Sequence, residues 1–149
     1  MKRINQYKKL FEITGPIELK ALKTKYRNLV KEWHPDKFQA DNPMAAEAEI
    51  KSLEIIEGYH FLISIAPETK VANQEAYNLT INEAGLADYR HKGLLLEVTF
   101  QDGTVYEYFG VSKNIYSKFV NADKPLRFAK RNIFNSFLYR KSKKAEEKN

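Results

Sequence analysis

The first third of the chain repeats its apolar residues at the spacing of a helix. Leu19, Leu22, Tyr26, Leu29 and Trp33 recur every three or four positions, which places them along one helix face. The basic residues Lys20, Lys23, Arg27 and Lys31 recur at the same spacing and fall on roughly the opposite side. This pattern predicts an amphipathic helix from about Pro16 to Trp33, with one apolar side and one basic side.

The predicted helix ends at the sequence Trp33-His34-Pro35-Asp36-Lys37. Pro35 cannot continue a helix, and it moves the preceding His34 out of the helical conformation. After a polar loop, a second periodic run from about Pro43 to Ile65 carries a predicted apolar face of Ile50, Leu53, Ile56, Tyr59 and Ile63. Two amphipathic helices joined by a loop are expected to pack antiparallel.

Two further segments flank this helix pair. Residues 5–13 are predicted to form a short helix with Tyr7, Leu10 and Phe11 facing inward, ended by Thr14-Gly15-Pro16. Residues 67–85 are polar and weakly periodic. They are predicted to form a linker or a peripheral segment, in which residues 79–81 are a candidate short strand.

From Leu86 onward the apolar period changes to two, which is typical of strands. Residues 94–100 and 105–109 alternate on either side of Asp102-Gly103, a strong hairpin signal, and residues 87–90 supply an opening strand. Two helices are predicted to follow. One is capped by Ser112, and the other runs from about Leu126 to Tyr139.

Together these elements predict an α+β protein. Residues 1–66 form a helical hairpin domain, and residues 67–85 form the linker or peripheral segment. Residues 86–141 form a small domain with a three-stranded antiparallel meander and two helices. Residues 142–149 form a charged tail that we expect to be disordered.

Composition narrows the class of protein. The 149 residues are 43% hydrophobic and 13% aromatic, which is enough to build buried cores. The absence of cysteine excludes disulfides and thiolate metal sites. No apolar run approaches the roughly 18 residues of a membrane helix, and the N-terminus does not read as a signal peptide. We therefore expect a cytoplasmic protein that does not bind membranes. The sequence leaves its oligomeric state open.

The positive charge is concentrated in the C-terminal part. Residues 85–149 hold 13 basic and 7 acidic side chains, a balance equal to the net charge of +6 for the whole chain. Ten basic residues and one acid, Asp123, lie between Lys113 and Lys144. This distribution favours an acidic partner such as nucleic acid, although many soluble proteins simply carry a basic surface.

The segment from Tyr7 to Ser64 resembles a J-domain, the module of DnaJ-like co-chaperones. The matching residues are Tyr7, Leu10, Tyr26-Arg27-Asn28-Leu29, His34-Pro35-Asp36-Lys37, Glu57-Gly58-Tyr59 and Leu62. The resemblance implies docking on a DnaK-type chaperone and stimulation of its ATP hydrolysis. It implies that the contact is made by His34, Pro35 and Asp36 and by the basic face Lys20, Lys23, Arg27 and Lys31.

Two residues depart from the J-domain pattern. Asn28 stands where the family usually carries a second basic residue, and Ser52 stands where it usually has a buried aromatic. We expect the first change to weaken docking and the second to loosen the helix pair.

The C-terminal part resembles the KTSC domain, which occurs in bacterial proteins and at the end of some lysyl-tRNA synthetases. The matching residues are Leu96, Val98, Phe100, Gly103, Tyr106-Glu107-Tyr108, Val111, Tyr116, Ala122 and Phe134-Asn135. Ser112 replaces the usual proline, and residues 122–134 are longer and more basic than the family pattern. The function of the family is not settled, and RNA binding has been suggested for it.

Tyr106 and Tyr108 share one face of the predicted strand. If Asp102-Gly103 is a two-residue turn, they pair with Thr99 and Glu97 on the more polar face. Exposed there, the two rings could stack on RNA bases, with Lys113, Lys118, Arg127, Lys130 and Arg131 as phosphate contacts. The other interpretation, which we favour slightly, is that the following helices cover both rings.

The residues show no catalytic constellation, and three scattered histidines make a structural metal site improbable. We therefore expect no enzymatic activity and no cofactor. The function predicted from the sequence is that of a co-chaperone with a C-terminal interaction domain for RNA or a protein client. The alternative is an RNA-binding protein that acts through that basic, aromatic domain.

Overall fold

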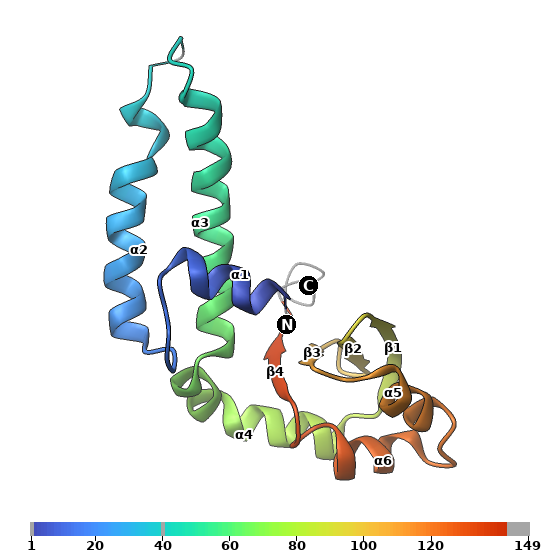
Figure 1. The fold of residues 1–149 in the computed structure, drawn as a ribbon. Coiled ribbons are helices and arrows are strands. Elements are labelled where there is room, and N and C mark those ends of the chain that lie inside the picture. The colour runs from blue at the N-terminus through green and yellow to red at the C-terminus, as the bar shows by residue number, and fades with distance from the viewer. Residues whose placement is uncertain (1, 40, 143–149) are drawn as a thin grey trace. The chain divides into compact units, whose positions relative to one another are not determined.

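The computed structural model describes residues 2–39 and 41–142, which form two compact units (Figure 1). The first unit spans Lys2–Val71, and the second takes up the chain from Ala72. The first contains α1 (Lys2–Leu10), α2 (Leu19–Trp33), the 3₁₀ helix η1 (Pro35–Lys37) and α3 (Ala45–Ile65). Helix α4 (Pro67–Glu83) runs across the boundary between the units.

The second unit has a four-stranded antiparallel sheet. Its strands are β1 (Leu86–Lys92), β2 (Leu95–Phe100), β3 (Val105–Phe109) and β4 (Leu138–Lys141), in the order β1-β2-β3-β4. Helices α5 (Lys113–Val120) and α6 (Pro125–Asn132) connect β3 to β4. The α+β fold class is confirmed. Among the described residues, none of the helices combines the length and the apolar character needed to cross a membrane.

Helices α2 and α3 pack antiparallel, as their periodicity predicts (Figure 1). The predicted apolar face of α2 is correct: Leu22 is buried, and the ring of Tyr26 stacks on that of Tyr59, with centroids 3.9 Å apart and planes at 10°. Helix α1 packs on α3 and buries Ile4. The chain between α1 and α2 adds Phe11 and Ile17 to this core.

The predicted apolar face of α3 is only partly correct: Tyr59 stacks on Tyr26 and Ile63 is half-buried, but its other three residues are exposed. Ile50 and Leu53 lie in solvent, whereas Ile55, Gly58 and Leu62 are buried on the other side of the helix. Apolar residues occur on every side of α3, so periodicity alone does not choose a face. Gly58 helps to decide it, because a Cβ there would lie 2.7 Å from Cδ1 of Tyr7. The side of α3 where Gly58 has no side chain therefore faces α1.

Residues 67–83, predicted as a linker or peripheral segment with a short strand, form helix α4 instead. The C-terminal half of α4 buries Tyr77, Thr80 and Ile81, and Tyr77 and Ile81 belong to the core of the second unit. The spacing of three and four between these residues is helical. This spacing is weak in the sequence because most of the other positions of α4 are exposed, and half of them are exposed and polar.

The C-terminal end of the second unit also differs from the prediction. Helix α6 ends at Asn132, not Tyr139, and residues 138–141 form β4, a fourth strand that pairs with β3. Ser142, placed in the disordered tail by the prediction, is buried and donates its backbone N–H to the carbonyl of Val105 at 2.8 Å. The remaining tail residues, 143–149, lie outside the described residues. The predicted cap of α5 is confirmed, because Ser112 Oγ accepts the N–H of Ile115.

The β2–β3 hairpin has a three-residue turn rather than a two-residue one. Phe100 and Thr104 close it, with the N–H of Phe100 2.8 Å from the carbonyl of Thr104, and Gly103 takes a φ of 89°. Tyr106 therefore pairs with Val98 and Tyr108 with Leu96. Shifting the register by one residue moves each side chain to the other sheet face, so both tyrosines join the apolar core.

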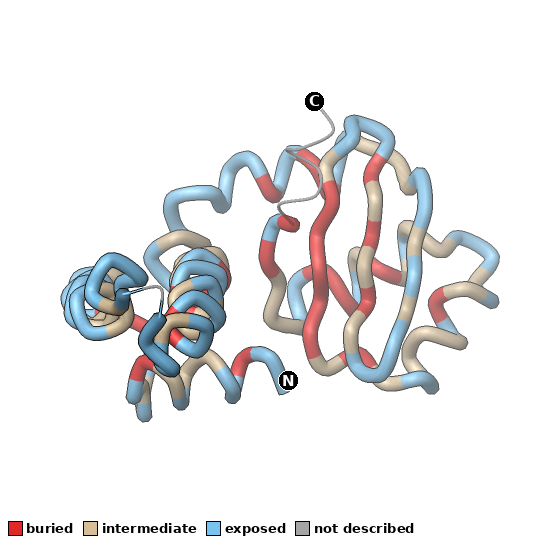
Figure 2. Tube along the Cα trace, turned by 90° about the horizontal axis from the view of Figure 1, so that it is seen from above, coloured by how far each residue is buried: buried red, intermediate tan, exposed pale blue. Residues whose placement is uncertain are grey.

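That core lies between one face of the sheet and the helices. Buried positions alternate along β2 and are continuous along β3 (Figure 2). Aromatic rings fill much of the space, and the largest fully buried ones are Tyr77, Tyr108, Phe100, Phe119 and Phe134.

A row of charged residues crosses the other face of the sheet, with one residue on each strand. The register aligns Arg90, Glu97, Glu107 and Arg140. Arg90 Nη2 lies 2.5 Å from Glu97 Oε1, and Arg140 forms a buried ion pair with Glu107. Each glutamate thus has an arginine beside it, which offsets the repulsion between the two facing carboxylates.

Candidate functional sites

The turn after α2 is a well-defined and exposed structure. His34 leaves the helical conformation, with φ −59° and ψ 130°, and Pro35 begins the single 3₁₀ turn η1. The backbone N–H of Asp36 donates to Nδ1 of His34 at 3.1 Å. With Nδ1 as the acceptor, the neutral imidazole carries its proton on Nε2. The turn therefore favours the tautomer of His34 that is protonated on Nε2.

Both polar side chains of the turn face solvent. The side chain of His34 is 49% exposed and that of Asp36 is 92% exposed, and Nδ1 lies 3.6 Å from Oδ2 of Asp36. With both side chains open to solvent, the arrangement suits recognition by hydrogen bonds and charge better than catalysis. Trp33 and Phe38 bracket the turn with their rings nearly parallel, 23° apart, at a centroid distance of 6.5 Å.

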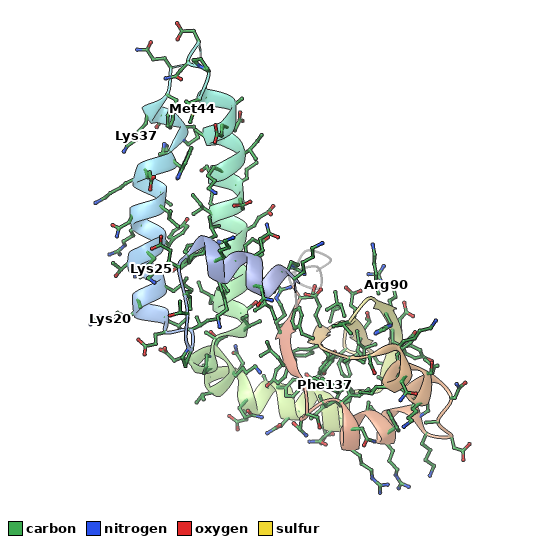
Figure 3. All side chains as sticks on the ribbon, viewed as in Figure 1. Lys20, Lys25, Lys37, Met44, Arg90 and Phe137 are labelled. Atoms are coloured by element: carbon green, nitrogen blue, oxygen red, sulfur yellow. The ribbon has the colours of Figure 1, made fainter. Side chains whose placement is uncertain are left out.

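The predicted basic face of α2 lies in solvent. Lys20, Lys23, Arg27 and Lys31 are all exposed, and Figure 3 shows Lys20 on the outer side of α2. Lys25 differs, because its Nζ donates to the carbonyl of Glu12 at 2.8 Å and ties α2 to the preceding loop. The first unit therefore brings the predicted basic residues and the turn together along one helix and its end.

One cation next to this surface is missing from the sequence prediction. Lys37 is exposed and closes the turn, since its N–H donates to the carbonyl of His34 at 3.0 Å (Figure 3). Its place directly after His34-Pro35-Asp36 is the signal that could have added it. Lys37 extends the positive surface beyond the end of α2.

Of the two interpretations of Tyr106 and Tyr108, the slightly favoured one, that the rings are covered, is confirmed, and base stacking is not compatible with their positions. Tyr106 is 5% exposed and Tyr108 is 0% exposed. The hydroxyl of Tyr77 donates to the carbonyl of Phe134 at 2.6 Å and, 3.0 Å away, accepts the hydroxyl of Tyr108. Burial raises the pKa of Tyr108 well above its ordinary value. These tyrosines hold α4 and the chain after α6 to the sheet.

The predicted phosphate-binding residues do reach the surface. Lys113, Lys118, Arg127 and Arg131 are exposed, and Lys130 is half-buried. They lie on α5 and α6.

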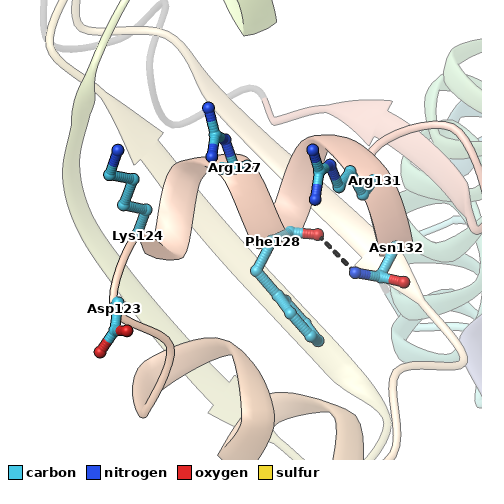
Figure 4. A pocket seen from close by; sticks show the side chains of 6 residues that line it. All are labelled: Asp123, Lys124, Arg127, Phe128, Arg131 and Asn132. Atoms are coloured by element: carbon cyan, nitrogen blue, oxygen red, sulfur yellow. Dashed lines mark hydrogen bonds between the residues drawn. The ribbon is translucent and has the colours of Figure 1, made fainter.

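Two of these cations, Arg127 and Arg131, share a surface hollow of about 330 Å³ at α6 (Figure 4). Asp123, Lys124, Phe128 and Asn132 complete its lining. The side-chain amide of Asn132 is engaged by the carbonyl of Phe128 at 3.0 Å. Lys124 is a further cation that the prediction missed, although its spacing of three and seven from Arg127 and Arg131 is helical. The hollow therefore gathers three cations and one carboxylate.

Among residues 2–39 and 41–142, no group of three or more His, Asp or Glu side chains is placed to hold a metal ion.

Comparison with known families identifies a KTSC domain at residues 84–137. No curated protein matches the chain. The matched region contains β1, β2, β3, α5 and α6, whereas Tyr77 of α4 and the strand β4 lie outside it. Packing of these outer elements on the matched ones extends the domain in this chain at both ends. The J-domain resemblance of residues 7–64 stays a prediction.

Proposed function

We propose that this protein is a co-chaperone that docks on a DnaK-type chaperone and stimulates its ATP hydrolysis. The contact is made by the turn His34-Pro35-Asp36 and by the basic face of α2. The observation that supports this most is their geometry: the turn is exposed directly at the end of the helix whose outer face is basic. The inner face of the same helix packs against α3.

The two parts of this surface have different roles in the proposal. The cations Lys20, Lys23, Arg27 and Lys31 attract an acidic surface and accelerate encounter, an effect that salt screens. The turn then supplies short-range hydrogen bonds, because His34 can donate from Nε2 and Asp36 offers an exposed carboxylate.

The direct test is single-turnover ATP hydrolysis by a DnaK-type chaperone from the same host. The wild-type protein is expected to accelerate hydrolysis, and His34→Gln and Asp36→Asn are each expected to abolish the acceleration. Both substitutions lie at exposed positions, so the circular dichroism spectrum should stay unchanged. If the wild-type protein accelerates none of its host's chaperones, the proposal is wrong.

The basic face is tested by charge reversal. Lys23→Glu with Arg27→Glu should weaken binding to the chaperone, most strongly at low salt. Asn28→Arg, which restores a second basic residue, should strengthen binding modestly. The matched control is the double reversal Lys113→Glu with Lys118→Glu, two exposed cations of α5 in the second unit. Equal effects of the two double reversals would mean that only net charge matters.

Binding of RNA by the second unit is the alternative function. The cations Lys124, Arg127 and Arg131 around the hollow at α6 support it. Tyr106 and Tyr108 do not, because both are buried and cannot stack on bases. Phosphate contacts alone give an affinity that falls steeply with salt and depends little on base sequence.

Fluorescence anisotropy of the full chain with labelled single-stranded RNA, measured over a range of salt, tests this alternative. Arg127→Ala with Arg131→Ala should reduce the salt slope by about two. Absence of binding at low salt would leave a protein client as the better partner for this unit.

A further inference from the structure

Helix α3 exposes a stripe of large aliphatic side chains on the side away from its packed face. Ile50 is 70% exposed, Leu53 58% and Ile56 39%. At 3.6 residues per turn, consecutive members of this stripe are about 60° apart around the helix, so the three form one continuous diagonal surface. The buried residues Ile55 and Leu62 lie on the opposite side.

The stripe has acidic neighbours. Glu49 and Glu57 are exposed, and they lie four residues before and four residues after Leu53, on the same side of α3. Lys51 is the single Lys or Arg in the sequence of α3, and its Nζ is engaged by Glu54 Oε1 at 3.5 Å. A partner on this face therefore meets aliphatic side chains between two carboxylates.

The charges argue against a second copy of this chain as the partner. Two such stripes facing each other would bring like charges together, which disfavours the contact. The basic outer face of α2 from another copy would match the charge. However, its exposed positions beside the lysines are Ala21, Thr24 and Asn28, which cannot cover three large aliphatic side chains.

We propose that this face of α3, the α3 stripe, binds a basic amphipathic helix of another protein. The partner places Leu or Ile side chains at helical spacing against Ile50, Leu53 and Ile56, and it places Lys or Arg beside Glu49 and Glu57. The stripe is exposed while α2 occupies the packed side of α3, so it is separate from the basic face proposed to dock the chaperone. This inference holds whether or not that proposal is correct.

The probe is a synthetic helical peptide of about 18 residues, with Leu at positions i, i+3, i+4 and i+7 and Lys on both flanks. Titration into the ¹⁵N-labelled full chain should shift the amide resonances of α3 residues 49–57 in a saturable way. A matched peptide with Glu in place of each Lys should bind at least about tenfold more weakly, because its charges oppose Glu49 and Glu57.

Two sets of variants locate the site. Ile50→Ser with Leu53→Ser should weaken binding at least about tenfold, and Glu49→Lys with Glu57→Lys should remove the preference for the basic peptide. Leu79→Ser is the matched control, because Leu79 is 63% exposed on α4. All substitutions are at exposed positions, and circular dichroism confirms that each variant is folded.

Three results would overturn the proposal. Equal binding of the acidic peptide would indicate unspecific apolar adhesion. A loss from Leu79→Ser as large as that from the stripe variant would mean that any exposed leucine suffices. Sedimentation showing a wild-type dimer that Leu53→Ser converts to a monomer would make a second copy the occupant of the stripe.

Discussion

Two pairs of tyrosines, one in each unit, lie at different depths. In the first unit, Tyr26 and Tyr59 stack on each other while each keeps part of its surface in solvent. In the second unit, Tyr77 and Tyr108 are fully buried and hydrogen-bonded to each other. The same residue type thus seals the edge of a helix pair in one unit and fills the core in the other.

The residues that carry the two family resemblances differ in the same way: those of the first unit lie at the surface, and those of the second lie in the core. In the first unit, the residues that make the resemblance specific, His34 and Asp36, lie in solvent and are free to contact a partner. In the second, the corresponding residues Tyr106, Tyr108 and Phe134 form the core. A match to the KTSC domain at residues 84–137 therefore describes how this unit folds, and its binding surface has to come from other residues.

The largest expected effect is that of Tyr108→Ala on the stability of the second unit. Removing a fully buried ring leaves a cavity, and the free energy of unfolding should fall by about 3–5 kcal/mol. Tyr26→Ala, at a partly exposed ring, should reduce the stability of the first unit much less. Urea denaturation measures both, followed by the fluorescence of Trp33 for the first unit and by near-ultraviolet circular dichroism for the second. Equal losses would remove the contrast between the units.

The next largest effect is that alkaline pH should destabilise the second unit more than the first. Burial raises the pKa of both Tyr77 and Tyr108 above the ordinary value near 10, so the folded state keeps protons that the unfolded state loses. Stability is then complete below about pH 10 and falls as the pH rises, by up to about 1.4 kcal/mol per pH unit for each tyrosine.

Probes specific to each unit make this pH dependence measurable. Trp33 is the single tryptophan of the chain, so its fluorescence reports on the first unit alone. Near-ultraviolet circular dichroism, dominated by the packed tyrosines, follows the second. We expect the second unit to lose stability between pH 10 and 11 before the first. Tyr108→Phe should reduce this dependence while Tyr77 keeps its share, and an unchanged dependence would contradict the assignment to the buried phenols.

The smallest of these effects concerns the helix crossing in the first unit. Gly58→Ala adds a Cβ 2.7 Å from Tyr7 Cδ1, so the Tyr7 ring, or α1 with it, has to shift. Overpacking of this kind destabilises, while the better helix propensity of alanine offsets part of the loss. We expect a net loss of about 1–2 kcal/mol, measured by thermal unfolding monitored at Trp33.

Gly15→Ala is the matched control for this crossing, because a Cβ at Gly15 would meet nothing within 4 Å. It should leave the stability of the first unit nearly unchanged. A loss from Gly15→Ala as large as that from Gly58→Ala would indicate an effect of backbone flexibility rather than of packing.

Local chemistry determined much of this protein from the sequence alone. The end of α2 at His34 follows from Pro35, which fixes the backbone on both sides of itself. The cap of α5 follows from the hydroxyl of Ser112. The exposed basic side of α2 follows from periodicity, because its charged residues cannot be buried without partners.

Only the tertiary structure decided the positions that depend on non-local partners. One residue in the length of the hairpin turn determined whether Tyr108 faces solvent or the core, and the sequence Asp102-Gly103 is compatible with both lengths. The sequence did not predict helix α4 and strand β4, because only a few of their residues, such as Tyr77, are buried, and these pack on residues far away in the chain. On α3, apolar side chains lie on several sides. The contact of Gly58 with Tyr7 helps to determine which of these side chains are exposed.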